Sequence, residues 1–307
     1  MKIFLILCLL IPEMIISNSE FAVSKGFIEN LKKLTTWEVS EFDQNIFKHW
    51  TIEEVSKILN KVSPKKDNTK KIEVASDSYK GSYPPQFDAR DKWPNCIHPA
   101  MDQGNCSASW AFSVSGFISD NYCIKNGQDI LLSPQDPISC DYENYGCSGG
   151  YLDITFKYFE DKGGVTLQCF NYSSQSGKPP KCIKECQNSS IPYKKYGCIS
   201  KSTFSIGGEF DKMKNYLYNN GTLVTRMEVF QDFLTYKSGI YYHTTGHVLG
   251  AQDVKLIGYG HDDSIGWDYW ICENSWGENW GMKGFFMILE GNCDIDGNAI
   301  GCTTKSF

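Results

Sequence analysis

The hydrophobic positions along the chain fall into two kinds of pattern. Helical patterning occurs in five segments, at residues 27–34, 52–62, 110–124, 151–161 and 210–219. Beyond the last of these, the apolar residues form short runs separated by Gly or Asn, which predict strands at residues 223–225, 239–243, 254–259, 269–272 and 284–289. A helical part followed by a strand-rich part predicts an α+β fold.

The first residues have a pattern of their own. Lys2 precedes an apolar run at residues 3–11, which Pro12 and Glu13 interrupt, and a small polar stretch follows at residues 17–19. The run is too short to cross a bilayer, which takes about 20 apolar residues. It predicts a signal peptide at residues 1–17 and a chain without a membrane span. We therefore expect the protein to enter the secretory pathway and to be located either outside the cell or in a lysosome-like vesicle.

Residues 18–82 differ from the rest of the chain. They contain no Cys, two of the helical segments and a lysine-rich, Pro-containing stretch at residues 63–71. Helices followed by a charged linker predict a detachable pro-region at residues 18–82, ahead of a main domain at residues 83–307. An ordinary N-terminal subdomain is the alternative.

The net charge limits which partners the protein can bind, and the cysteine content indicates disulfides. With 30 Lys+Arg against 36 Asp+Glu, the net charge is −6, whereas nucleic acids and anionic membranes are bound by basic surfaces. We expect neither partner. Of 13 Cys, Cys8 leaves with the signal peptide, and the remaining twelve can pair as six disulfides without an obligatory free thiol. Metal binding by these cysteines is the alternative, which an oxidising compartment disfavours, and we expect no metal and no cofactor.

The sharpest local pattern is a turn that opens into an apolar helix, at residues 102–113. Cys106 and Ser109 lie where this helix begins, and Gln103 precedes them. The first turn of a helix presents unpaired N–H groups and a partial positive charge, which can stabilise a thiolate or a developing oxyanion. The segment therefore predicts a nucleophile position, with Gln103 as a nearby amide donor.

These residues carry a family resemblance. Residues 103–112 resemble the active-site signature Gln-Gly-x-Cys-Gly-Ser-Cys-Trp-Ala-Phe of the papain family of cysteine peptidases. Residues 35–37, 83–96, 236–243 and 273–281 are similar to the pro-region, the mature N-terminus and two active-site segments of its cathepsin B group. The resemblance implies a papain-like fold, in which a helical left domain (83–195) faces a β-barrel right domain (196–307) across a cleft.

Two departures from the family pattern concern catalysis. Ser109 stands where the family has its catalytic Cys, and Gln252, six residues before the triplet at 258–260, stands at the position of the catalytic His. Gln cannot accept a proton and return it at neutral pH. His243 and His247 lie 134 and 138 residues after Ser109, within the usual papain-type spacing, so a substitute base remains an alternative.

The resemblance also implies what is retained. Asn274 matches the residue that orients the catalytic imidazole, and Gln103 matches the oxyanion-hole donor. The leading expectation is a monomeric, catalytically inactive homologue whose cleft binds peptides, proteins or its own pro-region. One alternative is an endopeptidase that uses Ser109 with His243 or His247, and another is a purely structural protein.

Disulfide pairs are implied by the same resemblance. They are Cys96–Cys123, Cys106–Cys147, Cys140–Cys182 and Cys169–Cys186, which leaves Cys198–Cys302 and Cys272–Cys293. The complete pairing agrees with the absence of a Cys nucleophile. Asn171, Asn188 and Asn220 begin Asn-x-Ser/Thr triplets in expected loops and are candidate glycan acceptors.

Overall fold

The computed structural model describes residues 20–62 and 83–306. The expected signal peptide and the lysine-rich stretch lie outside these ranges. The helices are α1 (Lys25–Leu34), η1 (Phe42–Gln44), α2 (Ile52–Ile58), α3 (Ala89–Lys92), α4 (Ser109–Asn126), α5 (Gln135–Cys140), α6 (Leu152–Asp161), α7 (Phe210–Asn220) and η2 (Gln231–Thr235). The strands are β1 (Glu38–Val39), β2 (Phe87–Asp88), β3 (Tyr196–Cys198), β4 (Phe204–Ile206), β5 (Leu223–Phe230), β6 (Tyr236–Ser238), β7 (Ile240–Tyr241), β8 (Val248–Asp262), β9 (Trp267–Glu273), β10 (Phe285–Leu289), β11 (Ala299–Gly301) and β12 (Thr304–Ser306).

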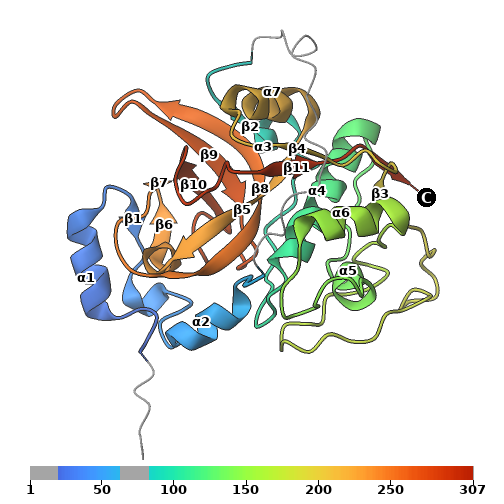
Figure 1. The fold of residues 1–307 in the computed structure, drawn as a ribbon, viewed down its shortest axis with the longest axis horizontal. Coiled ribbons are helices and arrows are strands. Elements are labelled where there is room, and N and C mark those ends of the chain that lie inside the picture. Colours follow the sequence, from blue (N-terminus) through green and yellow to red (C-terminus); the bar gives the residue numbers. More distant parts are fainter. Residues whose placement is uncertain (1–19, 63–82, 307) are drawn as a thin grey trace, which may run out of the picture.

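Figure 1 shows a helical half built on α4, α5 and α6 beside a strongly curved sheet, so the papain-like α+β architecture expected from the sequence is confirmed. α4 is buried along most of its length and packs on α6, where the rings of Phe117 and Phe156 meet edge to face at 5.3 Å. It ends at Gly127, whose positive φ of 67° lets its N–H reach the carbonyl of Cys123.

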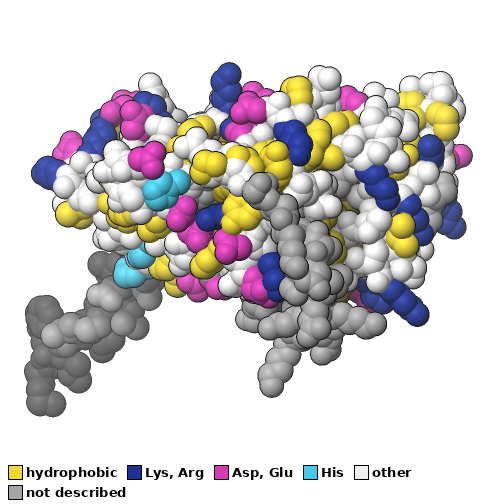
Figure 2. Space-filling model, turned by 90° about the horizontal axis from the view of Figure 1, so that it is seen from above, with side chains coloured by type: hydrophobic (Ala, Val, Ile, Leu, Met, Phe, Trp, Pro, Cys, Tyr) yellow, Lys and Arg dark blue, Asp and Glu magenta, His cyan; other side chains and the backbone are white. Residues whose placement is uncertain are grey.

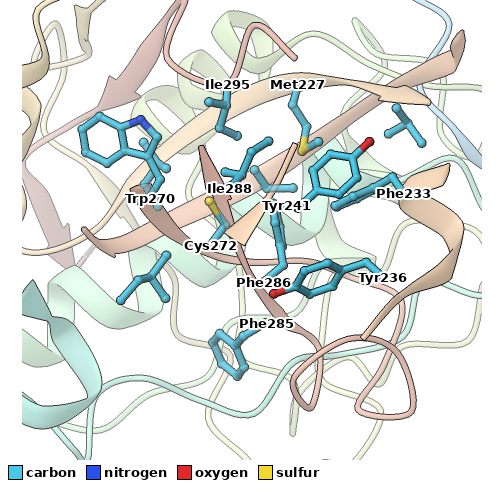
Figure 3. Close-up of a cluster of buried hydrophobic side chains, with 14 of the residues drawn as sticks. Met227, Phe233, Tyr236, Tyr241, Trp270, Cys272, Phe285, Phe286, Ile288 and Ile295 are labelled. Carbon is cyan, nitrogen blue, oxygen red and sulfur yellow. The ribbon is translucent and has the colours of Figure 1, made fainter. Parts of the chain in front are cut away.

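The sheet half is organised around the long strand β8. The strand order is β4-β11-β5-β8-β9-β10-β7, and β8 pairs antiparallel with both β5 and β9. Its interior is filled by aromatic and aliphatic side chains such as Phe233, Tyr241, Trp270 and Phe286 (Figure 3). Burial of this many large apolar side chains is the main stabilising contribution in this half.

Residues 20–62 pack against the sheet half rather than forming a separate body (Figure 1). β1 pairs with β6, and Trp37 contacts Tyr236 and Tyr241 at ring distances of 6.0 and 5.2 Å. A capping box joins Thr51 to Glu54 at the start of α2. The helix predicted over 52–62 is wrong in its second part, because the chain becomes extended at Leu59 and Asn60 pairs with Ala251.

Five of the six expected disulfides are present. They are Cys96–Cys123, Cys106–Cys147, Cys140–Cys182, Cys169–Cys186 and Cys198–Cys302. The expected Cys272–Cys293 pair is wrong, since both are free thiols. Cys272 lies on β9 inside the barrel core (Figure 3), whereas Cys293 follows β10 and contacts Asn292. Because these two cysteines are unpaired, complete pairing of the cysteines no longer supports the absence of a Cys nucleophile.

The two free thiols are in protected environments. Burial raises the pKa of Cys272 well above its usual value, and burial also raises the pKa of Cys293, to about 12. Thiols of this kind are protonated at neutral pH and are poor nucleophiles.

Two further features concern possible membrane-spanning helices and the charge of the surface. None of the helices in the described ranges is both long and apolar enough to cross a bilayer. On the face seen in Figure 2, acidic and basic side chains are both present and do not form a continuous basic surface.

Candidate functional site

Ser109 is the first residue of α4 and lies at the junction between the helical half and β8. Its side chain is fully buried. Ser109 Oγ lies 3.2 Å from Asp253 Oδ2 and 3.2 Å from the backbone N of Asp253. The hydroxyl therefore donates to the carboxylate and accepts from the amide of one and the same residue.

Gln252 belongs to a neutral network. Its Nε2 lies 2.9 Å from Gln103 Oε1, 2.9 Å from Asn274 Oδ1 and 3.1 Å from Ser275 Oγ. In the described part of the chain, Gln252 Oε1 and Asn274 Nδ2 are buried without a hydrogen-bond partner. The structure thus brings three of the four expected site residues together as amides, while Ser109 bonds elsewhere.

Asp253 and Arg226 are site residues that the sequence did not reveal. Arg226 Nε donates to Asp253 Oδ1 at 2.7 Å and Nη2 donates to Oδ2 at 3.1 Å, from directly paired positions on β5 and β8. Burial by itself would lower the pKa of Arg226, but the charge and hydrogen bonds of Asp253 raise it above its usual value. The available signal was two opposite charges, each one residue outside a strand predicted at 223–225 or 254–259, but their pairing depends on strand register.

The cleft beside Ser109 is filled by the chain's own N-terminal segment. Gln103 Nε2 donates to the carbonyl of Ile58 at 2.8 Å, and Ser107 Oγ donates to that of Leu59 at 2.9 Å. Asn60 forms both backbone hydrogen bonds with Ala251, at 2.8 and 3.1 Å. Residues 58–60 therefore occupy the amide donor that the resemblance assigns to the oxyanion hole.

The two candidate substitute bases have other surroundings. The ring of His243 stacks on Phe230 at 3.7 Å, and its Nδ1 lies 3.2 Å from both carboxylate oxygens of Asp232. His247 is exposed and accepts through its backbone carbonyl from Gln231. Within the described ranges, the hydrogen bonds found for Ser109 involve Asp253 and no histidine.

A buried group of charges lies next along β8. Lys255 Nζ contacts Asp120 Oδ2 at 2.6 Å and Glu273 Oε2 at 2.8 Å. Burial raises the pKa of Glu273, and the carboxylate of Asp120, whose Oδ1 lies 3.8 Å from His98 Nδ1, raises the pKa of His98. The described residues contain no group of three or more side chains arranged to hold a metal ion.

Comparisons with known proteins place this arrangement in one family. The model of the papain family of cysteine proteases matches residues 83–303. Cathepsin B-like CP1 of Giardia intestinalis is 39% identical over 223 residues, which cover 69% of this chain and 71% of that protein. Cathepsin B of Dictyostelium discoideum is 32% identical over 318 residues, covering 96% and 98%.

A solved structure agrees over nearly the whole chain. The structure of proCathepsin B S9 from Trypanosoma congolense matches with a TM-score of 0.85 at 30% identity, covering 93% of this chain and 99% of that one. The chain therefore belongs to the papain family and is a cathepsin B-like protein.

Proposed function

We propose that this protein is a catalytically inactive member of its family that acts by binding peptide or protein segments in its cleft. The observation that carries the proposal is the state of Ser109. Its hydroxyl is held by the Asp253–Arg226 ion pair, and the side chain at the expected base position is the amide of Gln252. A hydroxyl needs a base that accepts its proton and later returns it to the leaving group.

Asp253 is unsuited to that task. Its two carboxylate oxygens already accept hydrogen bonds from Arg226, and Oδ2 also accepts from Asn60. A proton moving from Ser109 to Asp253 would neutralise the partner of a largely buried guanidinium, which is strongly unfavourable. Removing the nucleophile or the base from a comparable catalytic triad lowers turnover by about 10⁶.

The ability to bind a peptide is supported by the segment that fills the cleft. Residues 58–60 are held by side chains of Gln103 and Ser107 and by the backbone of β8. Adding an extended segment to a strand in this way is a general mode of peptide recognition. The polar groups of the cleft are thus arranged to hold an extended chain, whether or not they cleave it.

The same proposal covers the organisation of the precursor. We place a signal peptide at residues 1–17 and a pro-region at residues 18–82, ahead of the main domain. The docking of residues 20–62 and the match to a procathepsin B support the pro-region. Because the protein would lack peptidase activity, another protease would have to remove the pro-region. Five disulfides support the secretory pathway, and fractionation of cells against medium distinguishes lysosome-like vesicles from secretion.

The test is peptide hydrolysis by the folded full chain, cut within residues 63–82 at an introduced protease site. A fluorogenic endopeptidase panel should give no turnover above that of the Ser109→Ala variant. Turnover that depends on Ser109 and is blocked by serine-directed reagents would overturn the proposal and favour a histidine-assisted endopeptidase.

A further inference from the structure

The side chain of Asn60 lies in a closed pocket beside Ser109. It is only 1% exposed. Its Nδ2 donates to the carbonyl of Gly150 at 2.7 Å and to Asp253 Oδ2 at 2.8 Å, while its Oδ1 accepts from the backbone N of Val62 at 3.1 Å. A primary amide has two hydrogens, and each one meets an acceptor here.

The pocket is shaped by residues of both halves of the molecule. Arg226 Nη2 donates to the carbonyl of Gly150 at 3.0 Å, so it fixes one acceptor, and its ion pair with Asp253 fixes the other. At Gly149, with φ +108°, an added Cβ would lie 2.7 Å from Asn60 Oδ1 and would close the pocket. Both acceptors are therefore also fixed by Arg226, which does not belong to the bound segment, and such preorganisation lowers the cost of binding.

The hydrogen-bonding groups that line the pocket favour one class of side chain, a primary amide. Both contacts to Nδ2 are oxygen acceptors, so they match a donor with two hydrogens and repel a carboxylate. An apolar side chain would leave the Asp253 carboxylate and a backbone carbonyl with fewer partners, which costs binding energy. The preceding position is apolar, since Leu59 is buried and lies against Gly250, where an added Cβ would come within 2.8 Å of Leu59 Cβ.

We propose that the cleft recognises extended peptide segments that carry an apolar residue followed by Asn, with the Asn amide in the Gly150–Asp253 pocket. Residues 58–62 are the tethered segment of this kind, and a segment of the same chemistry from another protein takes their place once the pro-region is cut. This inference rests on the proposed function and adds to it the class of ligand.

The experiment uses the folded full chain, cut at a protease site introduced within residues 63–82. A fluorescein-labelled peptide of residues 50–62 is equilibrated with the cut protein until its anisotropy is constant, in competition with unlabelled peptides. These are the natural sequence, Asn60→Ala, Asn60→Asp and, as a matched control, Lys61→Ala. All changes are in the peptide, so folding of the protein is not affected.

We expect Asn60→Ala to weaken competition by about 10-fold and Asn60→Asp by about 100-fold, because only the second brings a carboxylate against Asp253. The exposed neighbour change, Lys61→Ala, should stay within about 2-fold. Equal binding of the natural and Asn60→Asp peptides would overturn the pocket assignment and leave peptide binding intact. If none of the peptides binds, the proposed binding function fails as well.

Discussion

Gln252 and Asp253 are neighbours on β8, yet their side chains enter two different networks. Gln252 lies among the amides of Gln103 and Asn274, with no charge involved. Asp253 lies in a charged group with Arg226 and also holds Ser109. Consecutive residues of a strand point to opposite faces, so one step along β8 separates the two networks.

The difference shows how the expected site residues are divided between the two networks. The neutral network contains Gln252, which stands at the expected base position, and the residues at the expected orienting and oxyanion-hole positions. The charged network contains the expected nucleophile, fixed as a hydrogen-bonding group. The side chains at the nucleophile and base positions therefore each hydrogen-bond to other partners and not to one another, which is consistent with a binding role for the cleft.

Breaking the charged network should have the largest effect on stability. Arg226→Met leaves the buried carboxylate of Asp253 without its counter-charge and should lower the free energy of unfolding of the full chain by about 3–5 kcal/mol. Urea denaturation measures this change in the free energy of unfolding. The matched control is Lys237→Met, which breaks the exposed pair with Glu38 and should leave the free energy of unfolding nearly unchanged. Similar losses for both variants would contradict the contrast.

Breaking the neutral network should cost less. In Gln252→Leu, Gln103 Oε1 keeps the hydrogen bond from Ser275 Oγ at 2.6 Å, and Asn274 Oδ1 keeps that from the backbone N of Ser275 at 2.8 Å. We expect a loss of about 1–2 kcal/mol in urea denaturation. Gln252→Glu should cost more than Gln252→Leu, since it turns a carboxylate toward two carbonyl oxygens. The reverse order would show that the network is not as described.

Ser109→Ala should have a smaller effect still. The variant loses the two hydrogen bonds with Asp253, but Arg226 and Asn60 continue to satisfy that carboxylate. The expected change in the free energy of unfolding is about 1 kcal/mol, with no change in peptide hydrolysis. A loss of several kcal/mol would mean that Ser109 supports the charged network more strongly than its geometry indicates.

The smallest expected effect is a pH-dependent contribution of His98 to stability, through the charged group next to Lys255 on β8. The carboxylate of Asp120, whose Oδ1 lies 3.8 Å from His98 Nδ1, raises the pKa of His98. The ring also contacts Asp129 at 2.8 Å and faces the charges of Lys255 and Glu273. Protonated His98 therefore contributes stability that is complete below about pH 6.5 and is lost as pH rises through its raised pKa. The difference in stability between the natural protein and His98→Asn should shrink from pH 6 to pH 9. A constant difference would contradict this assignment.

The sequence predicted the large helices well, because their apolar patterns are long. The segment predicted at 110–124 is α4, which begins one residue earlier, at Ser109. The resemblance led to Gln103, Gln252 and Asn274, which do meet. Arg226 and Asp253 were missed because their contact depends on the register of β5 and β8. Tertiary contacts likewise ended α2 at Ile58.

The central claim, that the cleft is intact and only the chemistry is missing, is tested most directly by reversion. The cut full chain would be compared with the same chain carrying Ser109→Cys and Gln252→His, on one fluorogenic peptide panel. We expect no cleavage by the natural protein, and cleavage by the revertant that thiol-directed reagents block. Cleavage by the natural protein, lost on Ser109→Ala, would contradict it.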